Sequence, residues 1–356
     1  MNDNQIPLDF INNIIQGDNI DLIKKIPDNS INCIITSPPY YQQRDYGLGW
    51  GTDETIIEYI NKLIKLFEQC IRVLKKDGHI LYNLGDKYIK SNLGLIPYRF
   101  AIKVKEVFPE LILINNVTWV KKNPTPRQFK RRLVSATEPF FDFVKTKKYY
   151  YNREAFLMDK ERNKKNHKIV VSPDKGKHYI NLIKESEILT DKQKENALKD
   201  IDMMLNEMAE GEITDFRMKI KGIHKAAYGG HEGGRKTQIE QNGYTMIRMY
   251  GKKMKKDAVI FPKETVSFSK HPAMYPKDLI KEFLLLLSRE GDIILDPYMG
   301  SGTTALACKE TNRKFIGFEI NPEYCKEARK RLGFKKDTNN GKNIDNGQKS
   351  ILTYTD

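Results

Sequence analysis

The chain has 356 residues, with 61 Lys and Arg against 46 Asp and Glu, and a formal net charge of +15. This length predicts a catalytic domain with a smaller module, and the basic balance favours a phosphate-rich partner whose binding depends strongly on salt. No apolar run approaches the roughly 18 residues that span a bilayer, and no signal peptide opens the chain. We therefore expect a cytoplasmic protein without a membrane partner.

Metal and disulfide chemistry are not expected. The four cysteines, Cys33, Cys70, Cys308 and Cys325, show no C-x-x-C pairing, and the six histidines show no metal-ligand spacing. We expect reduced thiols and no bound metal.

A strand-like run, Asn32–Thr36, leads directly into Ser37-Pro38-Pro39-Tyr40. Ligands of open α/β sheets bind at the carboxyl ends of strands. Pro38 has no N–H and offers a carbonyl acceptor on a stiff backbone, while Ser37 adds a hydroxyl and Tyr40 a flat ring. This set can hold an amine between two acceptors while a base stacks on the ring. Taken alone, the Pro-Pro pair is more typical of a turn that closes a strand.

Helical and strand patterns then alternate. Glu54–Lys75 carries apolar residues at three- and four-residue spacing, which predicts a helix with one face in the core. Apolar or β-branched runs predict strands at His79–Leu84, Leu111–Trp119 and Pro139–Val144. This alternation predicts an α/β fold with a doubly wound, mostly parallel sheet and helices on both faces.

A basic run follows the predicted strand Leu111–Trp119. It contains no acid, and we expect it to be a phosphate clamp. Its members are Lys121, Lys122, Arg127, Lys130, Arg131 and Arg132.

The middle of the chain shows few strand signals before Thr245–Met249. Ser186–Glu210 reads as a helix with many acids, so we do not expect it to face phosphates. Ala226–Asn242 is rich in glycine and polar residues, which predicts a loop. Such a loop could reach base edges through Arg235 and Lys236, or it could be a surface loop without that role.

The last third carries a strand, a glycine turn and a helix in succession, at Asp292–Leu295, Asp296–Gly302 and Thr303–Glu310. Gly300 and Gly302 let backbone N–H groups approach a ligand closely, and the helix N-terminus favours polar or anionic groups. A second strand, Lys314–Phe318, ends at Glu319, an acid that can accept hydrogen bonds from ribose hydroxyls.

Two other nucleotide sites compete with this interpretation. A phosphate-binding P-loop requires Lys-Ser or Lys-Thr after its last glycine, whereas Thr303-Thr304 follow Gly302. Gly300, Gly302 and Ala305 formally satisfy a dinucleotide fingerprint. However, only one helix, Pro322–Leu332, follows Glu319, so the remaining strands of the sheet must come from the first half of the chain.

Together these segments resemble the DNA amino-methyltransferases that use S-adenosyl-L-methionine, and their order resembles the circularly permuted β group. In that group the catalytic motif precedes a target-recognition region and the cofactor motif comes last. The resemblance covers roughly residues 14–152 and 258–335. It implies a circularly permuted methyltransferase fold with a catalytic part at 1–152, an inserted target-recognition region at 153–257 and a cofactor-binding part at 258–335. We expect the tail, 336–356, to be disordered.

The resemblance also implies roles for residues. Ser37, Pro38, Pro39 and Tyr40 match the catalytic tetrapeptide. Glu319 matches the ribose-binding acid, and Asp18, before the helical Ile20–Ile26, matches an acid that contacts the adenine amine of the cofactor. The cofactor loop is matched by Asp296, Tyr298, Gly300, Gly302 and Thr303, with Tyr298 where the family more often has Phe. His271 and Pro272 begin a further cofactor-side stretch before the helical Lys277–Leu287.

The reaction implied is direct methyl transfer to the amine of an extruded base, without a covalent enzyme intermediate. Within the family, Ser at the position of Ser37 is typical of cytosine-N4 enzymes, and Asp of adenine-N6 enzymes. Trp119–Pro126, Arg132-Leu133 and Glu138 also resemble the cytosine-N4 members. We therefore expect a sequence-specific cytosine-N4 methyltransferase acting on double-stranded DNA, as a monomer or homodimer, in a restriction-modification system with a separate restriction endonuclease. Adenine-N6 methylation and a non-catalytic DNA-binding regulator are the alternatives.

Overall fold

The computed structural model describes residues 5–42, 55–124, 131–152, 155, 157–159, 174–210, 212–224, 234–249, 252–254, 256–264 and 274–334. The chain divides into two compact units, Met1–Phe156 with Lys256–Asp356, and Leu157–Lys255. Several sequence predictions fall outside the described residues: the cofactor contacts His271 and Pro272, the basic Arg127 and Lys130, and the tail 336–356.

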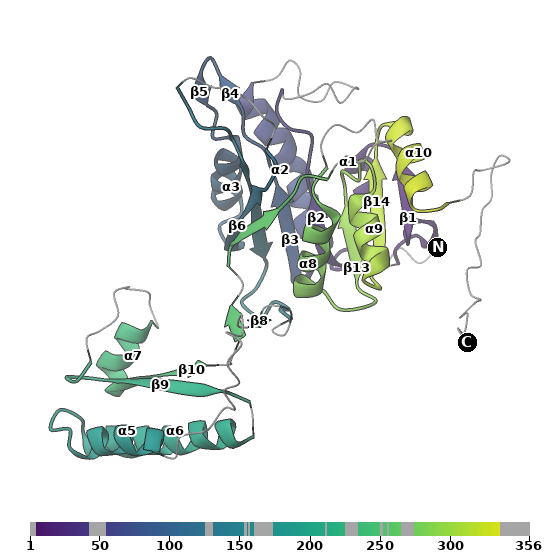
Figure 1. Ribbon diagram of the computed structural model, residues 1–356. Helices are drawn as coiled ribbons and strands as arrows, with labels where there is room; N and C mark the ends of the chain where they lie inside the picture. The colour runs from purple at the N-terminus through teal and green to yellow at the C-terminus, as the bar shows by residue number, and fades with distance from the viewer. Residues whose placement is uncertain are drawn as a thin grey trace. The chain divides into compact units, whose positions relative to one another are not determined.

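The first unit is built on a sheet of eight strands within the described ranges (Figure 1). Strand β7 runs antiparallel to its neighbours β3 and β6, and every other adjacent pair is parallel. In order across the sheet, the strands are β1 (Asn13–Gln16), β14 (Lys314–Glu319), β13 (Ile293–Asp296), β2 (Ile31–Thr36), β3 (Leu74–Asn83), β7 (Thr137–Val144), β6 (Ile112–Lys121) and β12 (Ala258–Phe261).

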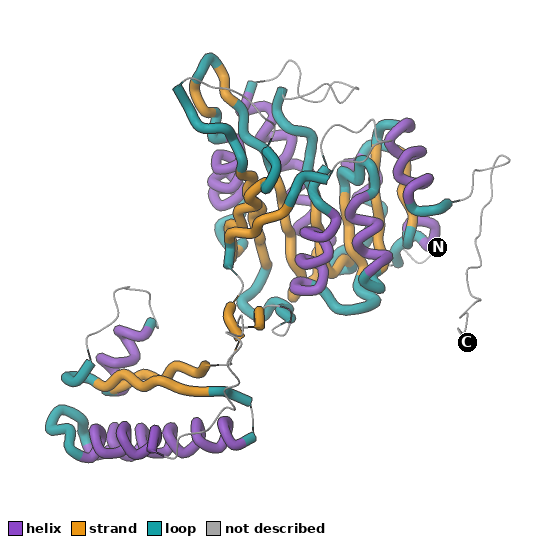
Figure 2. The backbone as a smooth tube through the Cα atoms, in the orientation of Figure 1, coloured by secondary structure: helices purple, strands orange, loops and turns teal. Residues whose placement is uncertain are grey.

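Helices cover both faces of this sheet (Figure 2). Neighbouring residues of β2 point to opposite faces, so Ile34 joins one apolar cluster and Ile35 the other. The predicted doubly wound, mostly parallel α/β fold is confirmed. The first cluster includes residues of α1 (Asn19–Ile23), α2 (Ile56–Val73) and α3 (Ile96–Val107), and the second includes residues of α8 (Lys277–Leu287), α9 (Thr303–Glu310) and α10 (Pro322–Arg331). A 3-10 turn, η1 (Leu8–Phe10), and a small hairpin, β4 (Tyr88–Ile89) with β5 (Asn92–Leu93), complete the described elements of this unit.

Helix α2 shows how the sequence pattern produces the core. Its residues at three- and four-residue spacing, including Leu63, Phe67 and Cys70, have no solvent exposure. The helix begins after Thr55, whose backbone N–H donates to the Glu58 carboxylate at 2.8 Å while its hydroxyl accepts from the Glu58 N–H at 3.3 Å. This capping box satisfies backbone N–H groups that the first helical turn leaves without partners.

The strand order brings together segments that are distant in the chain. Strand β13 pairs in parallel with both β14 and β2, so the carboxyl ends of all three strands lie at one edge of the sheet. Ser37, Pro297 and Ile320 each come directly after one of these strands. This edge is where open α/β sheets bind their ligands.

The second unit has its own apolar core, formed between α5 (Asp174–Lys184), α6 (Asp191–Ala209) and the antiparallel pair β9 (Asp215–Ile220) and β10 (Tyr244–Met249). Two sequence predictions are corrected in this unit. Strand β9 was not predicted, and Arg235–Asn242, expected in a loop, forms helix α7. Gly243 ends α7 in the left-handed region, with φ of 79°. The remaining described elements are β8 (Leu157–Asp159) and β11 (Lys252–Met254), which pair with each other.

None of the helices in the described ranges is both long enough and apolar enough to cross a membrane.

Candidate active site

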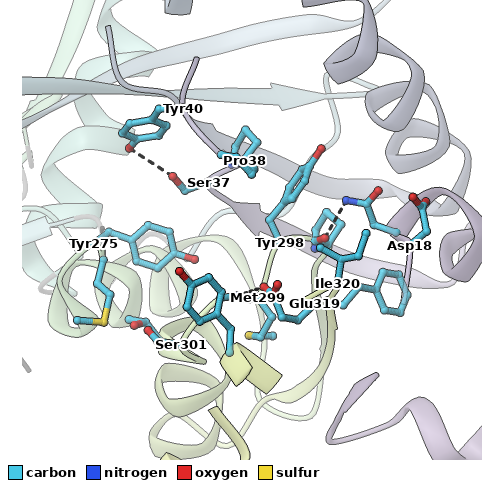
Figure 3. A pocket seen from close by; sticks show the side chains of 18 of the residues that line it. Asp18, Ser37, Pro38, Tyr40, Tyr275, Tyr298, Met299, Ser301, Glu319 and Ile320 are labelled. Atoms are coloured by element: carbon cyan, nitrogen blue, oxygen red, sulfur yellow. Dashed lines mark hydrogen bonds between the residues drawn. The ribbon is translucent and has the colours of Figure 1, made fainter. Parts of the chain in front are cut away.

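One pocket at the carboxyl edge of the sheet receives residues from both ends of the chain (Figure 3). It holds about 880 Å³ of space, including part that is open to solvent. The lining includes Asp18, Ser37, Pro38, Pro39, Tyr40, Tyr275, Tyr298, Gly300, Ser301, Thr303, Glu319 and Tyr324.

The glycine loop and Glu319 are joined by hydrogen bonds. The Gly300 N–H donates to one carboxylate oxygen of Glu319 at 2.8 Å, and the Asn321 N–H donates to the other at 2.8 Å. A carboxylate has about four acceptor positions, so both oxygens can accept a further donor from a ligand. Burial raises the pKa of Glu319, and the two backbone donors partly offset that shift. The side chain is therefore held in place as an acceptor that lines the pocket.

Glycine is required at the end of this loop. Gly302 has φ of 83°, a conformation that side chains rarely adopt, and a Cβ there would lie 3.1 Å from the Cβ of Ala328. Helix α9 starts directly after Gly302, and Thr303 in its first turn lines the pocket. A helix N-terminus favours polar and anionic groups of a ligand.

Asp296 is not among the residues that line the pocket, but it forms hydrogen bonds with residues that do. Its carboxylate is fully buried and accepts from the hydroxyls of Thr36 at 2.6 Å, Tyr275 at 3.0 Å and Thr304 at 2.5 Å, and from the Tyr298 N–H at 3.1 Å. Burial raises the pKa of Asp296, while these four donors act in the opposite direction. The structure thus places Asp296 as an organiser of the loop.

Helix α1 contributes the acid Asp18. Its carboxylate caps the helix by accepting from the Ile20 N–H at 2.8 Å, and the exposed side chain lines the pocket. The next residue, Asn19, donates from Nδ2 to the carbonyl of Pro297 at 3.1 Å. This bond ties α1 to the loop after β13.

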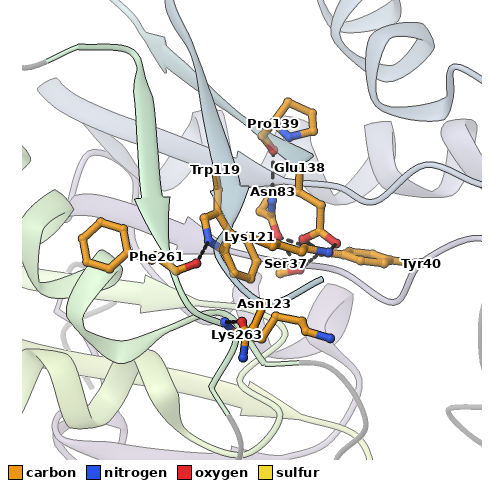
Figure 4. A network of polar contacts seen from close by, with 10 residues as sticks. All are labelled: Ser37, Tyr40, Asn83, Trp119, Lys121, Asn123, Glu138, Pro139, Phe261 and Lys263. Carbon is orange, nitrogen blue, oxygen red and sulfur yellow. Dashed lines mark hydrogen bonds and ion pairs between the residues drawn. The ribbon is translucent and has the colours of Figure 1, made fainter. Parts of the chain in front are cut away.

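The tetrapeptide that follows β2 is held by a polar network (Figure 4). Ser37 Oγ donates to Oδ1 of Asn83 at 3.2 Å, and it lies 3.3 Å from the Tyr40 hydroxyl. The carbonyl of Pro39 accepts from Tyr59 at 2.7 Å. The Tyr40 ring lies against the backbone of Gly85, where an added Cβ would come within 2.4 Å of the ring. Gly85 therefore makes room for this ring.

The residues predicted as a phosphate clamp divide into two groups. Lys121 is partly buried, pairs with Glu138 and lies 5.1 Å from the centre of the Trp119 ring, so its ammonium belongs to the polar network beside Tyr40. Lys122, Arg131 and Arg132 are exposed, and the Arg132 guanidinium stacks 3.7 Å from the centre of the Tyr88 ring. In the second unit, Arg235 and Lys236 are exposed in the first turn of α7.

None of the described residues that line the pocket is a cysteine. Cys33, Cys70, Cys308 and Cys325 are buried free thiols. Among the described residues, no group of three or more His, Cys, Asp or Glu side chains could hold a metal ion.

Sequence reasoning missed several residues that the fold brings to the site. Asn83 ends β3, the strand next to β2, so the rule that ligands bind at carboxyl ends could have identified it. Glu138 had no assigned role, yet its Oε2 lies 3.0 Å from the Tyr40 hydroxyl. Tyr324 lines the pocket from within α10, and no motif pointed to it. Tyr275, in contrast, belongs to the predicted cofactor-side stretch that begins at His271, and it also lines the pocket.

The donor and acceptor set suits a nucleoside-like ligand. Glu319 offers a fixed carboxylate for sugar hydroxyls, and Asp18 offers one for an exocyclic amine. The rings of Tyr298, Tyr275 and Tyr324 provide flat surfaces. No metal is needed for such a ligand to bind.

Comparison with known proteins agrees with this chemistry. Residues 31–330 match the N6/N4 methyltransferase family, described as DNA methylase. The chain is 24% identical over 350 residues to type II methyltransferase M.Cfr9I of Citrobacter freundii, covering 90% of this chain and 87% of that protein. It is 26% identical over 321 residues to DNA adenine methyltransferase YhdJ of Escherichia coli (strain K12), covering 90% of this chain and 82% of that protein.

Among solved structures, the fold is similar to that of PvuII DNA methyltransferase (cytosine-N4-specific). The TM-score is 0.53 at 16% sequence identity, and the alignment covers 92% of this chain and 87% of that one. The match of the family model over most of the chain, with the pocket just described, leads to one conclusion: the protein belongs to the N6/N4 family of S-adenosylmethionine-dependent DNA methylases.

Proposed function

We propose that the protein transfers a methyl group from S-adenosyl-L-methionine to the N4 amine of cytosine in double-stranded DNA. One observation carries this proposal: the tetrapeptide Ser37–Tyr40 and the acid Glu319 line the same pocket, although they lie at opposite ends of the chain. An amine-holding segment and a nucleoside-holding segment are thereby brought to one place.

The cofactor is assigned to the half of the pocket formed by the ends of β13 and β14. Glu319 accepts from the ribose hydroxyls, Asp18 accepts from the adenine amine, and Tyr298 contacts the flat base. Gly300, Gly302 and Thr303 form the turn around the ligand. Asp296 holds this turn in place through hydrogen bonds with Tyr298 and Thr304. The assignment of His271 and Pro272 to the same half stays a prediction, because both lie outside the described residues.

S-adenosylmethionine, when bound, supplies an electrophilic methyl group. The amine lone pair of a base is delocalised into its ring and is a poor nucleophile. Ser37 Oγ and the carbonyl of Pro38 accept the two amine hydrogens, which localises the lone pair and orients it. Tyr40 supplies a ring for stacking the extruded base. Holding the two reactants in line can lower the activation barrier by about 7 to 11 kcal/mol.

Ser37 supports cytosine as the target. A hydroxyl at this position resembles the cytosine-N4 enzymes, whereas adenine-N6 enzymes of this group usually have Asp there. Adenine-N6 is the second candidate, and the likeness to the E. coli adenine methyltransferase favours it. The product base distinguishes the two.

The exposed basic residues are assigned to DNA. Lys122, Arg131 and Arg132 contact phosphates near the pocket, while Arg235 and Lys236 of the second unit take part in target recognition. In this proposal the second unit is the target-recognition region, inserted into a circularly permuted methyltransferase domain. The likeness to type II methyltransferases such as M.Cfr9I supports a restriction-modification role. The separate endonuclease of such a system stays a prediction.

The test is a methyl-transfer assay with deuterium-labelled S-adenosylmethionine and DNA from a methylation-free host, followed by nucleoside mass spectrometry. Labelled N4-methylcytosine is the expected product. Labelled N6-methyladenine would show that adenine, and not cytosine, is the target base. DNA without label would refute the proposal.

A further inference from the structure

Four side chains, two of which belong to the tetrapeptide, form a connected polar chain from Ser37 to Glu138 (Figure 4). Ser37 Oγ lies 3.2 Å from Asn83 Oδ1 and 3.3 Å from the Tyr40 hydroxyl oxygen. The Tyr40 hydroxyl lies 2.8 Å from Asn83 Oδ1 and 3.0 Å from Glu138 Oε2. The amine-holding residue is thus linked to a carboxylate through one phenol.

The hydrogens of this chain have two compatible arrangements. In the first, Ser37 donates to Asn83 and Tyr40 donates to Glu138, which leaves the lone pairs of Ser37 available to a substrate amine. In the second, Ser37 donates to Tyr40 and Tyr40 donates to Glu138, so that the hydrogens point along the chain towards Glu138. The orientation of Asn83 is fixed because its Nδ2 donates to the carbonyl of Pro139 at 2.9 Å. The Asn83 oxygen therefore always faces the two hydroxyls as an acceptor.

We propose that Glu138 receives, through Ser37 and Tyr40, the proton that the target amine loses during methyl transfer. This inference rests on the proposed function. As the N–C bond forms and the C–S bond breaks, the bonding pair of that C–S bond stays on sulfur. The amine proton passes to Ser37 Oγ, the Ser37 proton to the Tyr40 oxygen and the Tyr40 proton to Glu138 Oε2. The N–H bonding pair returns to nitrogen. Sulfur loses its positive charge and Glu138 loses its negative charge, so the total charge does not change.

The chemistry of Ser37 explains why a relay is needed. A carboxylate at this position could keep the amine proton, but a serine hydroxyl cannot hold an extra proton and must release one of its own. Tyr40 is the hydroxyl beside it, and Glu138 is the carboxylate that Tyr40 reaches. Ser37 with Glu138 two proton transfers away thus gives the same overall result as a carboxylate at position 37.

The surroundings of Glu138 suit this role. Lys121 pairs with Oε1, which leaves Oε2 for Tyr40. The side chain of Glu138 retains 12% exposure, so the proton can return to water after each turnover. In the described part of the chain, the charged or titratable groups that contact Glu138 are Lys121 on β6 and Tyr40 after β2.

The experiment measures the single-turnover rate of methyl transfer to DNA from a methylation-free host across pH, with enzyme in excess and S-adenosylmethionine saturating. Glu138→Gln keeps an oxygen that can accept from Tyr40, so the ring stays in place, but it cannot take up the proton. Tyr40→Phe keeps the ring and breaks the relay. Glu310→Gln is the matched control, because Glu310 also pairs with lysine but lies at the far end of α9.

We expect Glu138→Gln and Tyr40→Phe to slow the transfer step about a hundredfold, the lower range for general base catalysis. The wild-type rate should fall at low pH, and this fall should be absent in Glu138→Gln. Glu138→Asp should recover part of the rate. Calorimetry should show unchanged affinity for S-adenosylmethionine in both slow variants, which establishes that each is folded. Time-resolved difference infrared spectra should show a transient protonated carboxyl band during turnover in the wild type and not in Glu138→Gln.

A wild-type rate in Glu138→Gln would overturn the relay while leaving the proposed function intact. A slow Glu138→Gln that keeps the same fall at low pH would also overturn it, because Glu138 would then only position Tyr40. If the wild type itself labels no base in DNA, the proposed function fails and the relay fails with it.

Discussion

The hydroxyl of Thr36 donates a hydrogen bond of 2.6 Å to Oδ1 of Asp296, joining residues that are 260 positions apart. Thr36 is the last residue of β2 and Asp296 the last of β13. The next residue after each strand lines the pocket, so this buried contact sets the distance between the tetrapeptide and the glycine loop. The two halves of the site are therefore aligned by a bond that lies outside the pocket.

Thr36→Val should test this alignment. The replacement keeps the shape of the side chain but removes one donor to a buried carboxylate, which should cost about 1 to 3 kcal/mol of unfolding free energy. Chemical denaturation measures that loss, and the affinity for S-adenosylmethionine should fall as well. Thr118→Val is a matched control on β6, because Thr118 makes no side-chain hydrogen bond to the described residues. Equal stabilities of the two variants would contradict the role given to the contact.

Ser37→Ala should separate binding from turnover. It removes one acceptor for the amine, and the single-turnover rate should fall about a hundredfold or more, as when one preorganised polar partner of a transition state is lost. Affinity for S-adenosylmethionine, measured by calorimetry, should not change. Ser30→Ala, which removes only a local bond to the carbonyl of Pro27, serves as the control. Unchanged turnover in Ser37→Ala would show that Ser37 does not hold the amine.

Glu319→Ala should weaken S-adenosylmethionine binding by about 1 to 3 kcal/mol, the usual effect of leaving buried polar partners unmatched. Calorimetry at neutral pH measures this change directly. Glu310→Ala is the control, since its carboxylate pairs with Lys277 and Lys281 away from the pocket. If Glu319→Ala binds as tightly as the control, another residue must hold the ribose.

The pH dependence of cofactor binding provides a separate test of Glu319. Burial raises the pKa of this carboxyl above the ordinary value of 4.5. The ionised form accepts hydrogen bonds from two hydroxyls and the protonated form accepts fewer, so affinity should fall with falling pH, beginning above 4.5. Glu319→Gln should bind more weakly and without this dependence. A wild-type affinity that stays constant through this range would contradict the assignment.

A buried pair inside the sheet should control stability at alkaline pH. His79 Nδ1 lies 2.9 Å from Asp142 and its Nε2 lies 2.6 Å from the carbonyl of Tyr150, so both ring nitrogens face acceptors. Burial lowers the pKa of His79, but the charge and hydrogen bond of Asp142 outweigh it and the net shift is upward from 6.5. A raised histidine pKa stabilises the fold below 6.5, and this stabilisation is lost as pH rises through the folded-state value.

Unfolding free energy should therefore decrease from pH 6 towards alkaline pH. Asp142→Asn should cost about 3 to 5 kcal/mol, the usual effect of removing one partner of a buried ion pair, and should flatten this decrease. Urea denaturation at a series of pH values measures both effects. An alkaline loss of stability that persists unchanged in Asp142→Asn would have another origin.

Periodicity and turn chemistry could predict the centre of the fold. Helix α2 has a clear apolar stripe, and β2 and β13 are short apolar runs that end at recognisable turns. The edge strands β1 and β12 have only four residues each and are partly exposed, so their patterns are weak. Strand β9 did carry a signal, because Phe216, Met218 and Ile220 alternate with polar residues and are buried.

The candidate site was predictable where a motif lies on one continuous segment. The tetrapeptide, the glycine loop and Glu319 belong to this class. Asn83 and Glu138 reach the site only because β3 and β7 are neighbours in the sheet, and the pattern of a single strand does not determine its neighbours. The same limit applies to Lys121, whose place in a basic run gave no sign that it pairs with Glu138.

The central claim is best tested by nucleoside mass spectrometry on DNA from a methylation-free host that expresses the protein, with Ser37→Ala as the control. We expect N4-methylcytosine in the host DNA with the wild type and far less of it with Ser37→Ala. N6-methyladenine in its place would contradict the base assignment, and the absence of any methylated base with the wild type would contradict the account as a whole.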